Sequence, residues 1–216
     1  PTSAFGGVIS CNFKVSKNLA LELNKIFIEV IIANGFDQEA LKILKSKKNI
    51  RIIDSTDFSN NEILRLNSSD TSFLVQSEDK QIFNEKNFKV VSKKRPTKSQ
   101  FKNLLFAFNV CRYVKSNAIV LASNNSTVGI GSGQPSRLDS CQIAINKMNK
   151  FMKTKTEIVA ASDAFFPFVD GIEKLIQSGV SAVIQPAGSI RDKEIINFAN
   201  TTNTILIFSK TRHFRH

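Results

Sequence analysis

Residues 116–137 read SNAIVLASNNSTVGIGSGQPSR, and this stretch decides the fold that we predict for the chain. The apolar run at 118–122 is bounded by turn-forming residues, which is typical of a short buried strand. The pair Asn124-Asn125 predicts a tight turn, because asparagine tolerates a positive φ angle. Residues 127–130 then predict a second strand, so the stretch indicates a β-hairpin.

The residues that flank this hairpin indicate a ligand site. The Gly-Ser-Gly sequence at 131–133 lets the backbone approach a neighbour closely, and a helix is expected to open at Ser136 and Arg137. The amide of Asn117 precedes the hairpin, and the fixed positive charge of Arg137 follows it. A neutral amide and a cation at the two ends of a glycine-lined surface favour a binding function over packing alone.

Strands and helices alternate along the rest of the chain. Apolar residues at helical spacing follow Ser16, Asp37 and Thr97, each of which can cap a helix, and Thr97 has Gln100 at the spacing of a capping box. The core face of the first helix is expected to carry Leu19, Leu23, Ile26, Phe27 and Val30. Further strands are expected near residues 8–13, 30–33, 50–53, 72–76, 88–91, 158–160, 182–185 and 204–208. This alternation predicts an α/β fold.

The polar, irregular segment 54–94 is interpreted as a boundary between two lobes. Within it, residues 54–69 are rich in Ser, Asn and Asp and are expected to include a connecting loop. The first α/β lobe, incomplete and including this linker, is expected at 1–94. The second, with the hairpin, an aromatic loop and a C-terminal tail, is expected at 95–216. The first residues, PTSAFGG, have neither a Met nor the features of a signal peptide, so residue 1 is expected to be the cut edge of a longer polypeptide.

The chain has 216 residues and a formal net charge of +12. This excess favours either nucleic acid, through counterion release, or an anionic small substrate on an otherwise solvated basic surface. The lysine groups are not interleaved with aromatic residues, and the sequence has no zinc-finger, RNP or helix-turn-helix pattern, so nucleic acid is not expected. No apolar run reaches about 18 residues, so no membrane span is expected either.

Three cysteines, Cys11, Cys111 and Cys141, lie on apolar segments without metal-like spacing. Their odd number and their spacing indicate a reducing cytoplasm and no metal site. We expect them to be small core residues.

Residues 162–168 read SDAFFPF. Because Pro167 restricts the residue before it, the segment is not expected to form a regular element. Its phenylalanines either plug the core or form an aromatic wall for a flat ligand, with Asp163 beside them. The loop that follows Gln185 lies at the carboxyl end of a strand and before a helix, where α/β folds often bind anions.

Six motifs occur in order along the whole chain, and together they carry a family resemblance. They are SAFGG (3–7), VKSNAIV (114–120), VGIGSGQPSR (128–137), SDAFFPF (162–168), IQPAGSIRD (184–192) and RHFRH (212–216). The chain resembles the C-terminal part of the AICAR transformylase domain in the PurH family, whose members join AICAR transformylase to IMP cyclohydrolase.

The resemblance implies a reaction in purine biosynthesis. A formyl group passes from 10-formyltetrahydrofolate to the 5-amino group of the imidazole carboxamide ribotide AICAR, which gives FAICAR. The implied fold is a pair of α/β/α lobes with mixed sheets, similar to cytidine deaminase but without its zinc. The implied partners are AICAR and reduced folate, with no nucleic acid and no membrane. A cytoplasmic homodimer with sites shared across its interface is also implied, and a monovalent cation is compatible with the family.

The resemblance also implies roles for single residues. Asn117 is the expected catalytic residue, hydrogen-bonding the substrate near the reacting amine and formyl group. The substrate is expected to contact Phe5, Gly6, Glu29, Phe165, Arg212 and His216, with the Arg212 guanidinium on the phosphate. The folate co-substrate is expected to lie near Arg137, Leu138, Asp163, Pro167, Phe168 and Asp170. The resemblance thus favours the aromatic wall over the plug.

The Lys-His pair that the family uses for proton transfer and for polarising the formyl group would lie before residue 1. Since each of these contributions is worth orders of magnitude in rate, we expect this chain alone to be inactive in formyl transfer. The alternative function is a catalytically inactive module for ligand binding or dimerisation.

Overall fold

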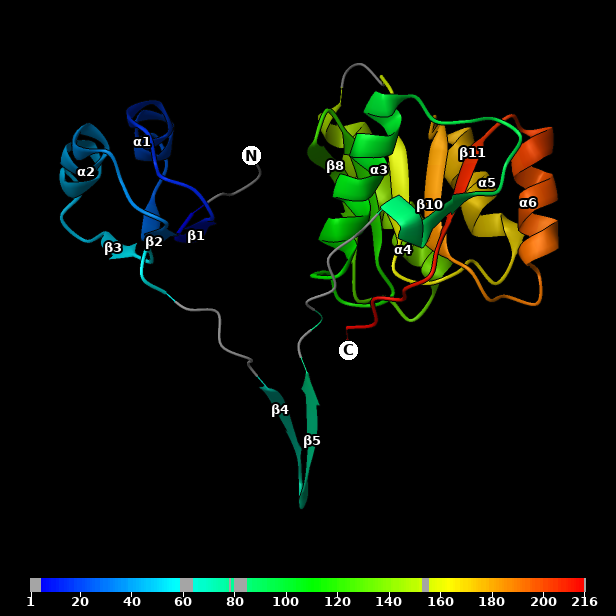
Figure 1. Ribbon diagram of the computed structural model, residues 1–216, viewed down its shortest axis with the longest axis horizontal. Coiled ribbons are helices and arrows are strands. Elements are labelled where there is room, and N and C mark those ends of the chain that lie inside the picture. Colours follow the sequence, from blue (N-terminus) through cyan, green and yellow to red (C-terminus); the bar gives the residue numbers. More distant parts are fainter. Residues whose placement is uncertain (1–4, 59–63, 78, 80–84, 153–155, 216) are drawn as a thin grey trace. The chain divides into compact units, whose positions relative to one another are not determined.

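Figure 1 shows the computed structural model, which describes residues 5–58, 64–77, 79, 85–152 and 156–215. The chain divides into two units, Pro1–Glu78 and Asp79–His216, and each is described by itself. The elements of the first unit are β1 (Gly7–Cys11), α1 (Lys17–Asn24), β2 (Ile28–Ala33), α2 (Gln38–Lys45), β3 (Arg51–Asp54), β4 (Leu64–Ser69) and β5 (Ser72–Ser77).

The first unit contains a three-stranded parallel sheet in the order β1-β2-β3. Ala20 of α1 and Leu44 of α2 are fully buried in one cluster with Ile31 of β2. The Ser16 hydroxyl caps α1 by accepting a hydrogen bond from the Leu19 amide at 3.4 Å. The expected length of this helix is wrong: α1 ends at Asn24, and Phe27 lies outside it with 43% of its surface exposed.

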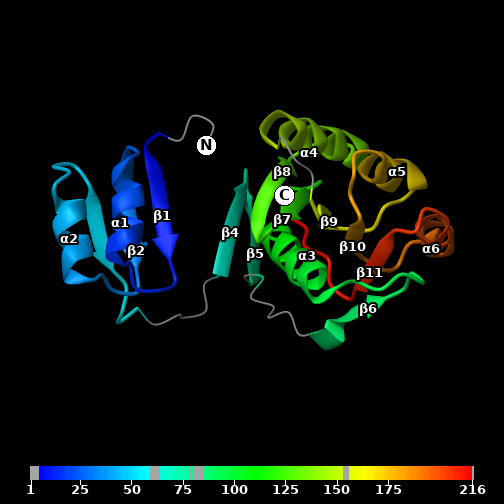
Figure 2. The ribbon, with the colours of Figure 1, turned by 90° about the horizontal axis from the view of Figure 1, so that it is seen from above.

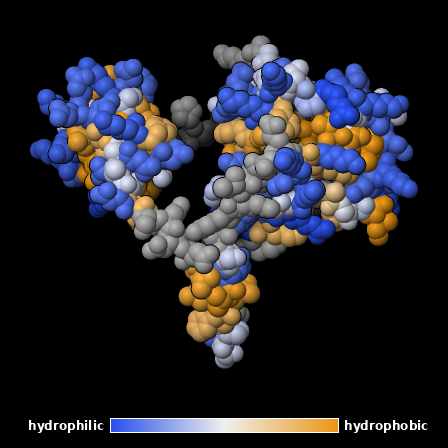
Figure 3. Space-filling view, in the orientation of Figure 1, coloured by the Kyte–Doolittle hydropathy of each residue, from blue (hydrophilic) through white to orange (hydrophobic). Residues whose placement is uncertain are grey.

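A separate two-stranded hairpin, β4–β5, completes the first unit. The segment 54–69, expected to include a connecting loop, also holds a strand, because residues 64–69 form β4 and pair antiparallel with β5. The register aligns Leu66 with Val75 and Ser68 with Phe73. Leu64, Leu66, Phe73 and Val75 therefore share one face, and all four are more than half exposed. This apolar surface can be followed in Figure 3.

The second unit is built on a six-stranded mixed sheet. Its elements are η1 (Glu85–Asn87), β6 (Phe88–Val90), α3 (Lys98–Cys111), β7 (Ile119–Ser123), β8 (Ser126–Gly131), α4 (Arg137–Phe151), β9 (Val159–Ser162), α5 (Val169–Gln177), β10 (Ala182–Pro186), α6 (Asp192–Thr201) and β11 (Ile205–Ser209). The strand order is β6-β11-β10-β9-β7-β8. Strands β9, β10 and β11 run parallel, β7 is antiparallel to β9 and to β8, and β6 is antiparallel to β11.

Helices cover both faces of this sheet (Figures 1 and 2). Alternate strand residues point to opposite faces, so Val120 packs with Phe108 and Cys111 of α3 while Leu121 packs with Met148 of α4. Helices α5 and α6 contribute their buried residues to the α4 side. The predicted α/β class with a mixed sheet is confirmed.

The boundary between the units lies within the segment 54–94, earlier than the expected division at residue 94. Residues 88–90, expected in the linker of the first lobe, form β6 and pair with the end of β11. Ser92 extends this attachment, because its hydroxyl accepts a hydrogen bond from the Leu206 amide at 2.8 Å. The sheet of the second unit therefore begins before the helix at Lys98.

The glycines of the central hairpin make room for a helix. A Cβ built on Gly131 would lie 1.9 Å from the Ser140 carbonyl oxygen of α4, and one on Gly129 would lie 2.1 Å from the Ala144 carbonyl oxygen. Gly133 has a φ of +67° and lies in the bend that follows the strand. The close approach predicted at 131–133 is therefore, at Gly131, an approach to α4, whereas a Cβ built on Gly133 would meet only the Lys115 side chain at 3.8 Å.

Candidate functional site

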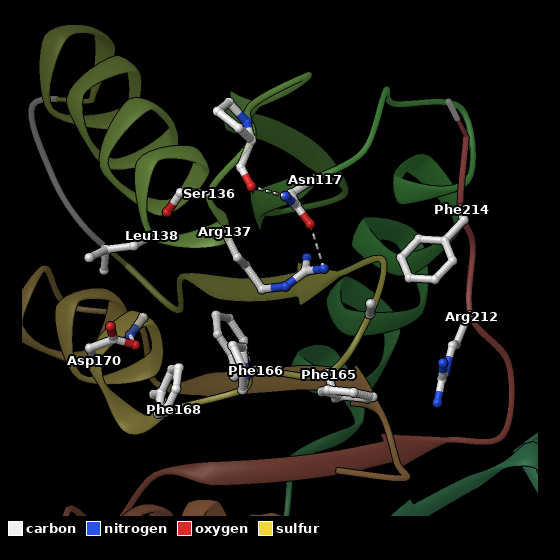
Figure 4. A pocket seen from close by; sticks show the side chains of 14 residues that line it. Asn117, Ser136, Arg137, Leu138, Phe165, Phe166, Phe168, Asp170, Arg212 and Phe214 are labelled. Carbon is white, nitrogen blue, oxygen red and sulfur yellow. Dashed lines mark hydrogen bonds between the residues drawn. The ribbon is translucent and has the colours of Figure 1, made fainter.

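A pocket of about 450 Å³ opens where β9 ends and β7 begins (Figure 4). Its volume lies within the range of about 300–1,000 Å³ that is usual for small-molecule sites. The lining comes from the turn before β7, the start of α4, the aromatic loop, the start of α5 and the C-terminal tail. The lining residues are Asn117, Pro135, Ser136, Arg137, Leu138, Ala164, Phe165, Phe166, Pro167, Phe168, Asp170, Gly171, Arg212 and Phe214.

A buried ion pair anchors the polar end of this pocket. The Arg137 guanidinium lies 2.5 Å from Oδ1 of Asp163, and their side chains are 9% and 0% exposed. The same Nη1 donates to the Ser162 hydroxyl at 3.0 Å, and Nη2 donates to Oδ1 of Asn117 at 2.9 Å. The two polar residues that flank the hairpin in the sequence are thus brought into direct contact, and Figure 4 shows them facing each other.

These contacts fix the orientation of the Asn117 amide. Because a guanidinium can only donate, the atom that faces Arg137 must be the amide oxygen. The Nδ2 group donates its two hydrogens to the carbonyl oxygens of Gln134 at 2.9 Å and Pro135 at 3.1 Å. A carbonyl oxygen has two lone pairs, so Asn117 retains one acceptor position on Oδ1 for a ligand and no further donor.

The aromatic loop divides its residues between the core and the pocket. Phe166 is 1% exposed and packs into the core, where its ring carbons would lie 2.8 Å from a Cβ built on Gly171. Phe165 and Phe168 line the pocket, and Phe168 is half exposed. The loop thus contains a buried ring, Phe166, which also lines the pocket, and two further lining rings, Phe165 and Phe168. Arg191, a residue that the sequence did not indicate, lies over the Phe168 ring at 4.7 Å.

The C-terminal tail brings a cation to the opposite side of the pocket. The Arg212 guanidinium lies 5.0 Å from the centre of the Phe165 ring. Among the described residues, no carboxylate forms an ion pair with Arg212. An exposed guanidinium stacked on an aromatic ring, without a carboxylate partner, is suited to bind an anionic group of a ligand.

The loop after β10 already satisfies its own backbone amides. The amides of Gly188 and Ser189 donate to the Asp192 carboxylate at 2.8 and 3.2 Å. The Asp192 side chain thus takes the place that the sequence left open for a bound anion at this helix start. Gly188 still approaches the pocket cation, since a Cβ built on it would lie 3.4 Å from Nη2 of Arg212.

The other expected site residues lie in different places. Leu138, Pro167 and Asp170 line the pocket, whereas Asp163 lies beneath it and acts through Arg137. Three belong to the first unit and are neighbours there: Phe5 stacks on Phe27 at 4.7 Å, and Gly6 has a φ of +66° beside the Glu29 carboxylate. His216 lies outside the described residues. The sequence missed Ser116 and Phe214, which lie inside two of the quoted motifs but show no local pattern of their own.

Within the described ranges, no group of three or more His, Cys, Asp or Glu residues is arranged to hold a metal ion. No helix in the described part of the chain is long and apolar enough to cross a membrane.

The thiols of Cys111 and Cys141 are expected to be unreactive in the folded chain. Burial raises the pKa of Cys141 from 9.0 to about 12, and burial also raises the pKa of Cys111 well above its usual value. A native-state titration with Ellman's reagent at pH 8 should modify these two cysteines only at the rate of unfolding, because the thiolate is the reactive form. Rapid labelling of Cys141 without unfolding would contradict this burial.

The raised pKa of Cys141 also predicts the direction in which the stability of the chain changes with pH. The unfolded thiol ionises near pH 9, whereas the folded thiol stays protonated to about pH 12. The contribution of this group to stability is therefore fully present below pH 9 and is lost as the pH rises toward 12. Cys141→Ala should remove this part of the alkaline dependence in urea unfolding.

A family model and several known proteins are similar to this chain, and they point to the same family. The family model described as AICARFT/IMPCHase bienzyme matches residues 1–147. The bifunctional purine biosynthesis protein PurH of Aquifex aeolicus is 44% identical over 216 residues, which cover 100% of this chain and 42% of the relative. The proteins of the same name from Caldicellulosiruptor saccharolyticus and Lactobacillus acidophilus are 43% and 44% identical over 217 residues, with 100% and 99% of this chain and 42% of each relative covered. The chain thus spans about two fifths of the length of these curated relatives.

Proposed function

The chain belongs to the AICARFT/IMPCHase bienzyme family, and we propose from this premise that its pocket binds AICAR and 10-formyltetrahydrofolate for formyl transfer in purine biosynthesis.

One observation carries the proposal: a single pocket joins a fixed hydrogen-bond acceptor, two aromatic walls and a cation that forms no ion pair within the described part of the chain. Oδ1 of Asn117 offers the acceptor, Phe165 and Phe168 offer flat apolar surfaces, and Arg212 offers the charge. AICAR has an amine donor, a flat heterocycle and a phosphate, and a reduced folate has a second flat ring system. The pocket is chemically complementary to both.

Asn117 is proposed to act as an acceptor toward the substrate amine. In the transfer, the amine nitrogen forms a bond to the formyl carbon, the bond from that carbon to N10 of the folate breaks, and the proton lost by the amine ends on N10. An oxygen that accepts an amine N–H orients the nitrogen lone pair toward the formyl carbon, which is a positioning contribution. Arg137 holds this oxygen in place through its 2.9 Å hydrogen bond.

The other residues expected at the site are proposed to contact either the folate or the nucleotide. Leu138, Pro167 and Phe168 are proposed to contact the folate, with Asp163 holding Arg137 from below. Asp170 accepts from the Gly171 amide at 2.7 Å and so orders the first turn of α5. Phe5, Gly6 and Glu29 of the first unit are proposed to contact the nucleotide. A homodimer with shared sites is included in the proposal, and sedimentation velocity on the full chain tests that part separately.

The charge on Arg212 gives the sharpest test of the substrate assignment. Arg212→Ala should weaken AICAR binding about thirtyfold, because a hydrogen-bonded charge pair with phosphate contributes about 2 kcal/mol. The loss should shrink for the dephosphorylated nucleoside, and isothermal titration calorimetry on the full chain measures both affinities.

Arg191→Ala is the matched control for this substitution. Arg191 is also stacked on a phenylalanine ring, but it is paired with Glu194 at 3.2 Å and does not line the pocket. Its replacement should leave AICAR affinity within about twofold, since exposed ion pairs contribute little. Equal affinities for wild type and Arg212→Ala would reject a phosphate site at Arg212.

A further inference from the structure

The C-terminal tail is held to the pocket by hydrogen bonds on alternate residues. The His213 amide donates to the Asp163 carbonyl oxygen at 3.0 Å, and the Arg215 amide donates to the Ser116 hydroxyl at 3.1 Å. The Ser116 amide in turn donates to the Arg215 carbonyl oxygen at 3.0 Å. The intervening residues, Arg212 and Phe214, line the pocket, as Figure 4 shows. The tail is thus an extended segment whose amides at 213 and 215 are hydrogen-bonded and whose side chains at 212 and 214 line the pocket.

Ser116 connects this tail to the buried ion pair. Its hydroxyl donates to Oδ2 of Asp163 at 2.6 Å while it accepts the Arg215 amide. These roles are fixed, because a carboxylate can only accept and a backbone amide can only donate. The carboxylate polarises the hydroxyl, which makes its oxygen a better acceptor for Arg215.

The His213 side chain is a second point at which the tail is attached. The His213 side chain is buried and lies 4.7 Å from the Phe108 ring of α3, with Nδ1 2.5 Å from Oδ2 of Asp79. Because this ring is fixed in the core, loss of the Ser116 hydroxyl would loosen the Arg215 amide without detaching β11, while the backbone hydrogen bond from the Ser116 amide to the Arg215 carbonyl oxygen remains. The Ser116 contact can therefore be tested in a folded chain.

We propose that Ser116 is a positioning residue that docks the C-terminal tail on the Arg137–Asp163 pair and thereby places Arg212 and Phe214 at the ligand. Asn117 and Arg212 both line the pocket, and Asp163 links them: through Arg137 to Asn117, and through Ser116 to the tail. The ligand part of this inference rests on the proposed function, whereas the docking part does not.

Hydrogen exchange tests the docking without any ligand. In Ser116→Ala, the Arg215 amide should exchange about tenfold faster, because it loses an acceptor that is bonded to a charged group. Ser178→Ala is the control for loss of a serine hydroxyl as such, since the Ser178 hydroxyl donates at 2.7 Å to the Leu175 carbonyl oxygen of α5. Unchanged exchange at Arg215 in Ser116→Ala, or an equal increase in both variants, would overturn the docking role.

A double-mutant cycle tests the link to the ligand, with AICAR as the probe. Ser116→Ala should weaken AICAR binding about tenfold in the wild-type background and should have little effect when Arg212 is already alanine. A purely structural role for Ser116 would weaken binding equally in both backgrounds, and that result would overturn the proposal. If wild type does not bind AICAR while the exchange at Arg215 responds as expected, the proposed function fails and the docking of the tail stands.

Discussion

Asp163→Ala is expected to destabilise the second unit by about 3–5 kcal/mol, because it leaves the buried charge of Arg137 without its partner. The Asp163 side chain is fully buried, and Arg137 Nη1 lies 2.5 Å from its carboxylate. The same carboxylate accepts from the Ser116 hydroxyl. One substitution therefore removes an ion pair and a charged hydrogen bond together.

Urea unfolding followed by circular dichroism measures this loss, and an exposed ion pair provides the control. Asp37 pairs with Lys14 at 3.0 Å, but the two side chains are 45% and 63% exposed. Asp37→Ala should change the free energy of unfolding by less than about 1 kcal/mol, as surface pairs generally do. Similar stabilities for Asp163→Ala and Asp37→Ala would show that the Arg137–Asp163 pair does not carry the site.

Gly131→Ala is expected to cost roughly 3–4 kcal/mol, because overpacking against rigid atoms cannot be relieved by a side-chain rotation. The added Cβ would lie 1.9 Å from the Ser140 carbonyl oxygen and 2.6 Å from its carbonyl carbon, so helix α4 would have to move as a whole. Helix α4 begins at Arg137. The substitution should therefore also disturb the hydrogen bond from Arg137 to Asn117 and weaken ligand binding.

Gly7→Ala separates this effect from the general cost of replacing a strand glycine. Gly7 lies at the start of β1, and a Cβ there would meet only the Ile28 side chain at 3.9 Å, an ordinary contact. We expect Gly7→Ala to change stability by less than about 1 kcal/mol, since alanine also restricts the unfolded chain more than glycine does. Comparable unfolding free energies for the two variants would contradict the close packing of α4 on β8.

Local patterns in the sequence predicted local structure well. Asn124 and Asn125 adopt φ angles of +50° and +54° in the turn between β7 and β8. Thr97 and Gln100 form both hydrogen bonds of the capping box at the start of α3. Each of these features depends on residues within four positions of one another, so neighbouring side chains determine it.

The predictions that failed depend on partners far along the chain. Strand β4 was hidden because its polar residues resemble a loop, and the alternation of Leu64 and Leu66 is recognisable only beside Phe73 and Val75 of β5. The glycine at 131 fits a ligand loop as well as a helix contact until α4 is placed against it.

Only part of the candidate site could be predicted, because some of its residues are close together in the sequence and others are far apart. Asn117 and Arg137 flank one hairpin, so closing that hairpin brings them together. Ser116 and Arg215 are 99 positions apart and meet through backbone and hydroxyl groups, which leave no signature in residue type. The ordered return of the tail therefore could not be derived from the sequence pattern.

Isothermal titration calorimetry of the full chain with AICAR, followed by a reduced-folate analogue, tests the central claim most directly. The proposed pocket predicts saturable AICAR binding at one site per chain, which weakens when Arg212 is replaced by alanine. If neither ligand binds, while the chain binds arbitrary DNA with an affinity that falls steeply as salt is added, the pocket is not a nucleotide and folate site.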